Sequence, residues 1–124
     1  MIRGLHHIAI LCSDREASLR FYTTLGFALY ESHLRPERGD EILMLHGHGI
    51  TLELFVSEGN PARVTGPEAY GLRHLALAVD ALEEVLRTLT DAGYEPEPIR
   101  RDTFTGERMT FVKDPDGLPI ELHE

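Results

Sequence analysis

Residues 7–27, HIAILCSDREASLRFYTTLGF, and residues 74–94, HLALAVDALEEVLRTLTDAGY, are two copies of one segment. They align without a gap at an offset of 67 residues. The identical positions are His7/His74, Ala9/Ala76, Glu16/Glu83, Leu19/Leu86, Arg20/Arg87, Thr23/Thr90 and Gly26/Gly93. Most of the other positions match in polar or apolar character. Because chance is a poor explanation for such a match, the chain is predicted to contain an internal repeat.

Each copy begins with an alternating or β-branched run, at residues 5–12 and 74–79, which is typical of a strand. A helix is predicted to follow. Ser13 with Glu16 and, in the second copy, Asp80 with Glu83 have the spacing of a capping box, which satisfies the free N–H groups of a first helical turn. Apolar residues at helical spacing then predict the buried stripes: Ala17, Phe21, Leu25 in one copy and Leu82, Val85, Leu86, Leu89 in the other. A glycine near the end of each copy, Gly26 and Gly93, supplies a left-handed stop.

Three shorter strand-like runs follow each helix. They are predicted near residues 27–33, 41–45 and 50–55 in the first copy, and near 95–101, 108–113 and 118–124 in the second. The segments 46–49 (HGHG) and 114–117 (DPDG) are turns by their Gly and Pro content. The fold class is therefore predicted to be α+β, with two tandem βαβββ modules in a curved mixed sheet and the helices on its outer face. We expect one domain over residues 1–124, with module 1 at about 1–56, a connector at 57–72 and module 2 at about 73–124.

Composition narrows the range of partners. Twelve Lys and Arg against 21 Asp and Glu give a net charge of −9, which disfavours nucleic acid because counterion release needs basic protein surface. No apolar run approaches the ~20 residues needed to cross a bilayer, so no membrane association is expected. The single cysteine, Cys12, excludes a disulfide framework, is expected in the core, and favours a cytoplasmic protein. Four basic residues are expected to be solvated surface, and the alternative is that they form a local basic patch that binds an anionic small molecule. They are Arg100, Arg101, Arg108 and Lys113.

Four polar residues interrupt the apolar strands at corresponding places in the two copies. Strand alternation puts Ile8 and Ile10 on one face and His7 on the other, and the same parity applies to His74. It also separates Glu53 from its leucine neighbours. The fourth residue, Glu121, lies between Ile120 and Leu122 in the same way. Because a carboxylate on a mostly apolar strand needs a compensating partner, His7, Glu53, His74 and Glu121 are predicted to surround one divalent metal.

Two nitrogen and two oxygen donors without a thiolate suit Ni²⁺, Co²⁺, Zn²⁺, Mn²⁺ or Fe²⁺, with waters in the remaining positions. Taken one at a time, such side chains on a strand are usually solvent-facing or hydrogen-bonded, and it is the set of four that favours a metal site. The other five histidines are expected to be surface or structural, with His6 pointing away from the face that carries His7. They are His6, His33, His46, His48 and His123.

Several stretches together resemble the vicinal oxygen chelate superfamily, which includes glyoxalases, bleomycin resistance proteins and dioxygenases. They are HHIAI (6–10), SDREASLRFY (13–22), ITLELF (50–55), GLRHLALAVD (71–80) and FVKDPDGLPIELHE (111–124). The His-Glu-His-Glu set is most similar to glyoxalase I, the lactoylglutathione lyase. This resemblance implies methylglyoxal detoxification, in which a hemithioacetal or a related 2-hydroxycarbonyl compound isomerises through a metal-bound enediolate. It also implies a carboxylate that carries the proton, for which we expect Glu121 first and Glu53 second.

The resemblance is incomplete at the positions where glyoxalase I grips glutathione. Leu11 stands where that family has an Arg, and Ser57 stands where it has an Asn, so another thiol is an open alternative. Two other functions also remain open: an Fe(II)-dependent ring-cleaving oxygenase, and a non-catalytic module that binds an antibiotic-type small molecule. Relatives pair their modules within one chain or across a dimer, and a homodimer is expected here.

Overall fold

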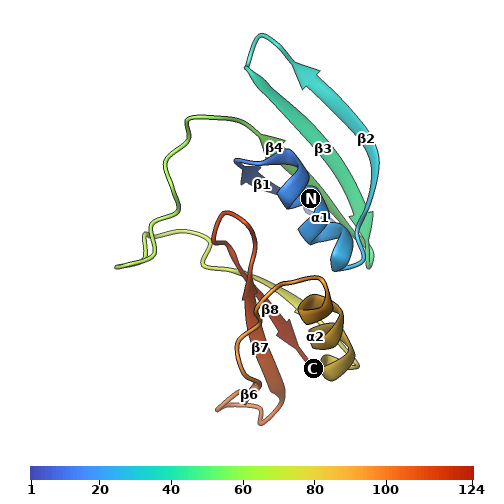
Figure 1. Cartoon of the computed structure of the whole chain (residues 1–124), viewed down its shortest axis with the longest axis vertical. Helices are drawn as coiled ribbons and strands as arrows, with labels where there is room; N and C mark the ends of the chain where they lie inside the picture. The colour runs from blue at the N-terminus through green and yellow to red at the C-terminus, as the bar shows by residue number, and fades with distance from the viewer. The chain divides into compact units, whose positions relative to one another are not determined.

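The computed structural model describes residues 1–124 and divides within the connector into two units, Met1–Pro61 and Ala62–Glu124 (Figure 1). The first unit contains β1 (Ile8–Cys12), α1 (Arg15–Thr24), β2 (Ala28–Arg35), β3 (Asp40–Gly47) and β4 (Ile50–Val56). The second contains β5 (Leu75–Ala78), α2 (Leu82–Asp91), β6 (Arg100–Arg101), β7 (Arg108–Lys113) and β8 (Pro119–His123).

Both units have the same sheet topology. The first sheet has the strand order β1-β4-β3-β2 and the second has β5-β8-β7-β6. In each sheet the first strand runs parallel to the last, and the other neighbouring strands are antiparallel. The strands β1 and β5 begin 67 residues apart, and so do the two helices. The prediction of an α+β fold with two βαβββ modules is therefore confirmed, in the form of two four-stranded mixed sheets.

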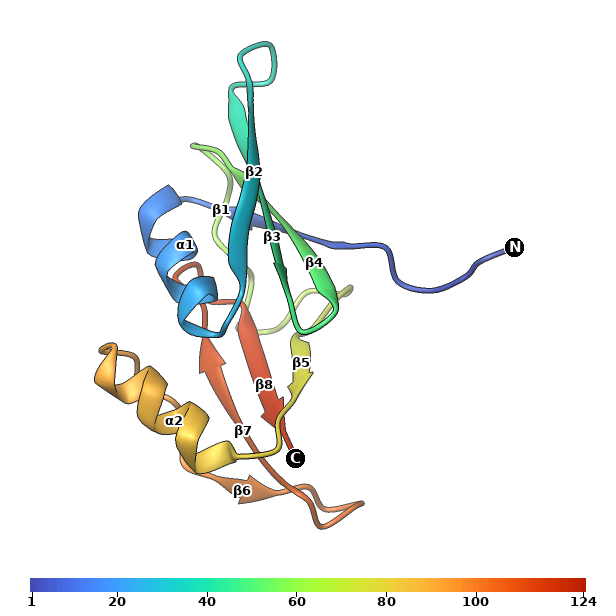
Figure 2. The same cartoon turned by 90° about the vertical axis from the view of Figure 1, so that its right-hand side faces the viewer.

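Each helix packs on one face of the sheet of its own unit (Figures 1 and 2). In the first unit the buried layer includes Phe21 and Tyr22 from α1 and Leu52 and Leu54 from β4, all without solvent exposure. Burial of one such side chain contributes roughly 1.5–3 kcal/mol relative to its exposure. The helix stripe is rotated from the predicted one, because Tyr22 is fully buried against Phe27 and Phe21 while Ala17 is only partly covered.

In the second unit, α2 lies on one face of the sheet (Figure 2), and the buried residues are Leu82 and Leu89 of α2, Leu77 of β5, and Ile120 and Leu122 of β8. The residues that alternate with these along β5 and β8 point to the opposite face of the sheet, as expected for a strand. The same parity in both units therefore leaves one uncovered sheet face, on which the predicted site residues lie.

The helix starts differ from the predicted capping boxes. Asp14, and not Ser13, is the N-cap of α1: its extended backbone lets the carboxylate accept a hydrogen bond from the amide of Ala17 at 3.0 Å. The N-cap of α2 is Ala81, which offers no side-chain acceptor, so Asp80 does not cap it. At Gly26 and Gly93 the predicted stops are confirmed, with φ of 94° and 93°.

The strand bounds differ most at β6, which spans only two residues where the sequence predicted a strand over 95–101. Pro96 and Pro98 lack the N–H that a sheet ladder needs, so this stretch makes only a single backbone bond to β7, from the amide of Glu97 to the carbonyl of Phe111 at 2.9 Å. In the first unit β3 continues to Gly47, so His46 belongs to a strand and the turn is limited to His48 and Gly49.

A cluster of charged side chains centred on Arg108, the first residue of β7, contacts α2 and the residue that follows β8. Arg108 donates hydrogen bonds to both carboxylate oxygens of Glu83 and contacts Glu124 at 2.5 Å. The Arg108 guanidinium lowers the pKa of the Glu83 carboxyl.

Neither helix is long and apolar enough to cross a membrane. Cys12 is buried as predicted and forms no disulfide.

Candidate active site

The first unit brings His7 and Glu53 together. Glu53 lies in the middle of β4, directly opposite Ala9 of β1, and its neighbours Leu52 and Leu54 are fully buried. Its carboxylate therefore points to the uncovered face. There Oε2 of Glu53 lies 3.1 Å from Nε2 of His7, which immediately precedes β1. The two side chains are 38% and 17% exposed for His7 and Glu53, so a ligand can reach the pair from one side.

The second unit repeats this arrangement with His74 and Glu121. Glu121 lies opposite Ala76 in the parallel pair of β5 and β8, between the buried Ile120 and Leu122. The Nε2 of His74 and Oε2 of Glu121 are 3.9 Å apart. This separation is too long for a direct hydrogen bond, so the imidazole and carboxylate face each other with a gap between them.

The structure thus joins the four predicted residues as two His–Glu pairs, one in each unit. Within either unit no third His, Cys, Asp or Glu completes a group that could hold a metal ion. Each pair nevertheless offers one imidazole nitrogen and one carboxylate oxygen on an open sheet face, and these donors fit a first-row divalent metal. That all four residues share one metal stays a prediction.

His6 lies elsewhere than predicted. Its Nδ1 is 2.8 Å from Nδ1 of His7, and the two rings meet edge to face with centroids 5.1 Å apart. The prediction that His6 points to the opposite face assumed a strand from residue 5. Because β1 begins only at Ile8, strand alternation does not separate these two side chains. His6 is therefore in direct contact with a predicted ligand.

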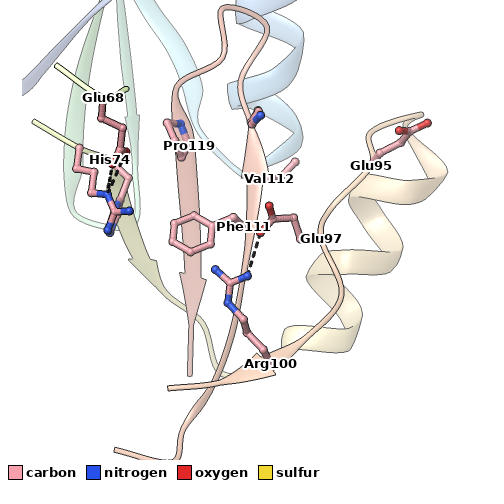
Figure 3. A pocket seen from close by; sticks show the side chains of 10 residues that line it. Glu68, His74, Glu95, Glu97, Arg100, Phe111, Val112 and Pro119 are labelled. Carbon is pink, nitrogen blue, oxygen red and sulfur yellow. Dashed lines mark hydrogen bonds and ion pairs between the residues drawn. The ribbon is translucent and has the colours of Figure 1, made fainter. Parts of the chain in front are cut away.

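His74 is held by an aromatic neighbour. The rings of His74 and Phe111 meet edge to face, with centroids 5.2 Å apart. Phe111 lies on β7 directly opposite Glu121 of β8, so it touches the row of residues that forms the pair (Figure 3). No sequence motif marks Phe111; the only available signal was its parity on β7, which is the same face as that of Glu121.

The remaining histidines make local contacts. His33 lies 2.9 Å from Glu31, and Nε2 of His48 lies 2.8 Å from the carbonyl oxygen of Leu25. His46 is exposed on β3. At the end of β8, the backbone carbonyl of Glu124 and the carboxylate of Asp102 raise the pKa of His123. None of these four belongs to either pair.

A cavity of about 640 Å³ opens beside His74, within the second unit. Its walls include Phe111 and the basic side chains of Arg73, Arg100 and Lys113 (Figure 3). Arg73 is engaged by both carboxylate oxygens of Glu68, at 3.0 and 3.2 Å. The cavity is large enough for a small organic ligand, and it extends from one of the two His–Glu pairs.

The two positions that differ from glyoxalase I lie at the surface of the first unit. Leu11 is 59% exposed on the uncovered face of β1. Ser57 follows β4, and its hydroxyl donates to the side-chain oxygen of Asn60. Neither residue presents a cation.

Comparison with known proteins agrees with this architecture. The sequence model of the Glyoxalase/Bleomycin resistance protein/Dioxygenase superfamily matches residues 4–122, nearly the whole chain. The chain belongs to this superfamily. Members of the superfamily bind small molecules and a divalent metal, and a solved fosfomycin resistance protein from Listeria monocytogenes was complexed with Mn(II). That structure shares the fold at a TM-score of 0.77 and 20% identity, over 99% of this chain and 93% of the other.

Other similar proteins have higher sequence identity to the chain. The uncharacterized protein YwkD of Bacillus subtilis is 48% identical, over 100% of this chain and 98% of that protein. A glyoxalase family protein from Enterococcus faecalis has a solved structure with a TM-score of 0.94 and 49% identity, over 98% of each chain. A probable lactoylglutathione lyase of Vibrio cholerae is 31% identical, over 94% of this chain and 86% of that protein.

Proposed function

We propose that this protein is a metal-dependent lyase or isomerase of the glyoxalase I type. Its substrate would be a hemithioacetal or a related 2-hydroxycarbonyl compound, which isomerises through an enediolate. The observation that carries the proposal is the repeated His–Glu pair on the uncovered face of each sheet, at 3.1 Å in one unit and 3.9 Å in the other. The likeness to a probable lactoylglutathione lyase supports the same reaction class.

His7, Glu53, His74 and Glu121 would hold one divalent ion, as Ni²⁺, Co²⁺, Zn²⁺, Mn²⁺ or Fe²⁺. When bound, this ion supplies Lewis acidity that stabilises the negative charge developing on the substrate oxygens. The two units would act as one domain over residues 1–124. We propose that the two pairs meet either within one chain or across a homodimer, so that each site receives one pair from each unit.

Glu121 is the residue to which we assign proton transfer, with Glu53 as the second carboxylate. The reaction needs a base that removes a proton from one carbon and returns it to the neighbouring carbon. A carboxylate beside the reacting carbons can do both steps. The two histidines would serve as ligands, each through the lone pair of one ring nitrogen.

The first test is to measure the metal content of tag-free protein by elemental analysis and then to follow thioester formation from methylglyoxal and glutathione. We expect activity after reconstitution with Ni²⁺, Co²⁺, Mn²⁺ or Zn²⁺, and its loss after removal of the ion by a chelator. Since Leu11 and Ser57 offer no charged contact, other thiols are tested beside glutathione. If the protein binds one ion per site but forms no thioester with any thiol, the lyase proposal is wrong.

The same assay discriminates two other superfamily activities. An Fe(II)-dependent oxygenase would consume O₂ and would tolerate Glu53→Ala, because three ligands suffice for that chemistry. A binding module would hold an organic ligand with no dependence on the ion. Stoichiometric metal with metal-dependent thioester formation would exclude both.

His6 is expected to orient His7 toward the ion. A ligating histidine usually fixes its ring through a hydrogen bond from its other nitrogen, and here that partner is Nδ1 of His6, at 2.8 Å. Imidazole suits this position because it accepts or donates as the tautomer of His7 requires. We expect His6→Ala to weaken metal affinity about 10- to 100-fold, measured by competition with a chromogenic chelator.

Arg73→Ala is the matched control, because Arg73 precedes His74 as His6 precedes His7 but contacts Glu68 instead. Loss of the Arg73 side chain should leave the metal affinity within about 3-fold of that of the unmodified protein, a much smaller change than the one expected for His6→Ala. Equal affinities of His6→Ala and the unmodified protein would show that the contact between the two rings does not support metal binding.

A further inference from the structure

We propose that β2, the outer strand of the first sheet, is a docking edge for a second copy of this chain. The second copy adds its own β2 in antiparallel register, with a two-fold axis through Ser32. The first sheets of the two copies then continue into one sheet. This edge is separate from the His–Glu pairs, and its use does not depend on the proposed reaction.

The strand β2 is open on its outer edge. In the strand order β1-β4-β3-β2 it pairs only with β3, so its other side carries unpaired N–H and C=O groups. Seven of its eight residues are exposed, and among them Tyr30 is 58% and Leu34 is 76% exposed. The hairpin of β2 and β3 extends past α1 (Figure 2). The helix therefore leaves the second half of β2 uncovered.

The usual protection of an edge strand is weak in β2. Natural edge strands are commonly protected by Lys, by Pro or by a bulge. The segment ALYESHLR contains neither Lys nor Pro. Its one bulge lies between Leu29 and Glu31, near the start of the strand. From Glu31 to Arg35 the ladder with β3 is continuous, so this part presents a regular edge to a further strand.

Geometry limits the registers that two copies of one strand can adopt. Along an edge strand, only every second residue directs its N–H and C=O groups outward. Two residues that lie opposite each other in an antiparallel pair either both direct these groups across the pair or both direct them away. Because both strands are β2, opposed residues must be an even number of positions apart. The two-fold axis therefore passes through a residue and not between two residues.

An axis through Ser32 makes the side chains of the two strands complementary. Glu31 of one copy then lies opposite His33 of the other, and this pair occurs twice by symmetry. Tyr30 approaches Leu34 of the second copy. Hydrogen-bonded cross-strand pairs and pairs that bury an aromatic side chain both stabilise a sheet. Within one chain Glu31 and His33 are 2.9 Å apart and more than half exposed, so both remain accessible to the second copy.

The neighbouring axes are less favourable. An axis through Glu31 puts two carboxylates directly opposite each other, and like charges in this position destabilise a pair of strands. An axis through His33 opposes two imidazoles and moves Tyr30 beside Pro36, which follows the end of β2 and cannot donate to a ladder. Ser32 is small and uncharged, so an axis through it avoids both problems.

The axis is tested with cysteine variants of the full chain under mild oxidation. Opposed residues in an antiparallel pair have Cα atoms about 4.5–5.5 Å apart, within the range of a disulfide. We expect Ser32→Cys to form a covalent dimer at least about 10-fold faster than Thr103→Cys, because pairing raises the effective concentration of the thiol. Thr103 is the matched control, since it is also a small exposed hydroxyl residue but lies outside β2. The native Cys12 is buried.

A mixture of Glu31→Cys and His33→Cys tests the register at a second position. These two positions lie opposite each other in the proposed pair, whereas two copies of either variant alone are diagonal neighbours at about 7–8 Å. We expect the mixed disulfide to exceed the amount that random collision gives. Equal rates for Ser32→Cys and Thr103→Cys, or a random mixture of the three disulfides, would overturn the proposed pairing.

Association without a cross-link is followed by NMR on ¹⁵N-labelled protein at increasing concentration. We expect the amide signals of Glu31–Arg35 to shift as the concentration rises. Ser32→Asp should weaken this association about 5-fold, because two carboxylates meet at the axis, and Ser32→Thr should retain it. Since the readout lies on β2, association through the His–Glu pairs alone does not satisfy the test. Signals of β2 that stay constant with concentration would refute the docking edge and leave the lyase proposal intact.

Discussion

Replacement of Glu121 by Gln is expected to lower kcat/KM for thioester formation by about 10²- to 10⁴-fold, the range typical of a lost general base. Gln keeps the size and hydrogen-bonding capacity of the side chain but cannot accept a proton from carbon. Because strand alternation puts the Glu121 side chain on the face opposite to the buried Ile120 and Leu122, the substitution is expected to leave the packing of β8 unchanged. The rate is measured after reconstitution with a saturating divalent ion.

Loss of a ligand and loss of a base are separated by two further measurements on Glu121→Gln. Metal content per protein shows whether the ion is still held, and proton exchange at the substrate carbon shows whether abstraction still occurs. Glu53→Gln is the companion variant, since Glu53 occupies the equivalent position of the first unit. A Glu121→Gln protein with full metal content and an unchanged rate would assign the base elsewhere.

The second large effect is expected on metal binding itself. His7→Ala and His74→Ala should each weaken affinity for a divalent ion by more than about 10²-fold, beyond the loss typical for a residue that only orients a ligand. The physical reason is that each variant removes one of two nitrogen donors from a set of four predicted ligands. Titration of the metal-free proteins with Co²⁺, followed by absorption, measures the affinity.

His33→Ala provides the control for these variants. His33 also lies beside a carboxylate, at 2.9 Å from Glu31, but both side chains are more than half exposed on β2. Its removal should leave Co²⁺ affinity unchanged. If His33→Ala weakened binding as much as His7→Ala, the ion would be held by scattered surface groups and the predicted site would be wrong.

The fold was predictable because each unit is built from local signals that agree with one another. Alternation in 7–12 and 74–79, helical spacing after them and the stops at Gly26 and Gly93 all appear twice at one offset. The predictions failed where a single backbone choice decided the outcome. Asp14 and Ser13 are both good caps, and only the turn that the chain adopts selects Asp14. The proline pair at 96 and 98 shortened β6 by removing two donors.

The candidate site was predictable to the extent that it follows strand parity. Parity placed Glu53 and Glu121 opposite the buried leucines and isoleucine, on the face where the structure finds each beside the histidine of its own copy. It failed at His6, which lies before the strand begins and is therefore free to contact His7. It also gave no reason to select Phe111 among the residues of β7.

The sequence by itself determined that the chain has two copies of one βαβββ unit and that each copy carries a His–Glu pair on an uncovered strand face. These features depend on periodicity, which is a property of neighbouring residues along the chain. Only the tertiary structure decided that Phe111 contacts both His74 and Arg100, and that Arg101 and Arg108 face α2. Such contacts depend on strand register, which hydrogen bonds between distant segments fix and which no local pattern encodes.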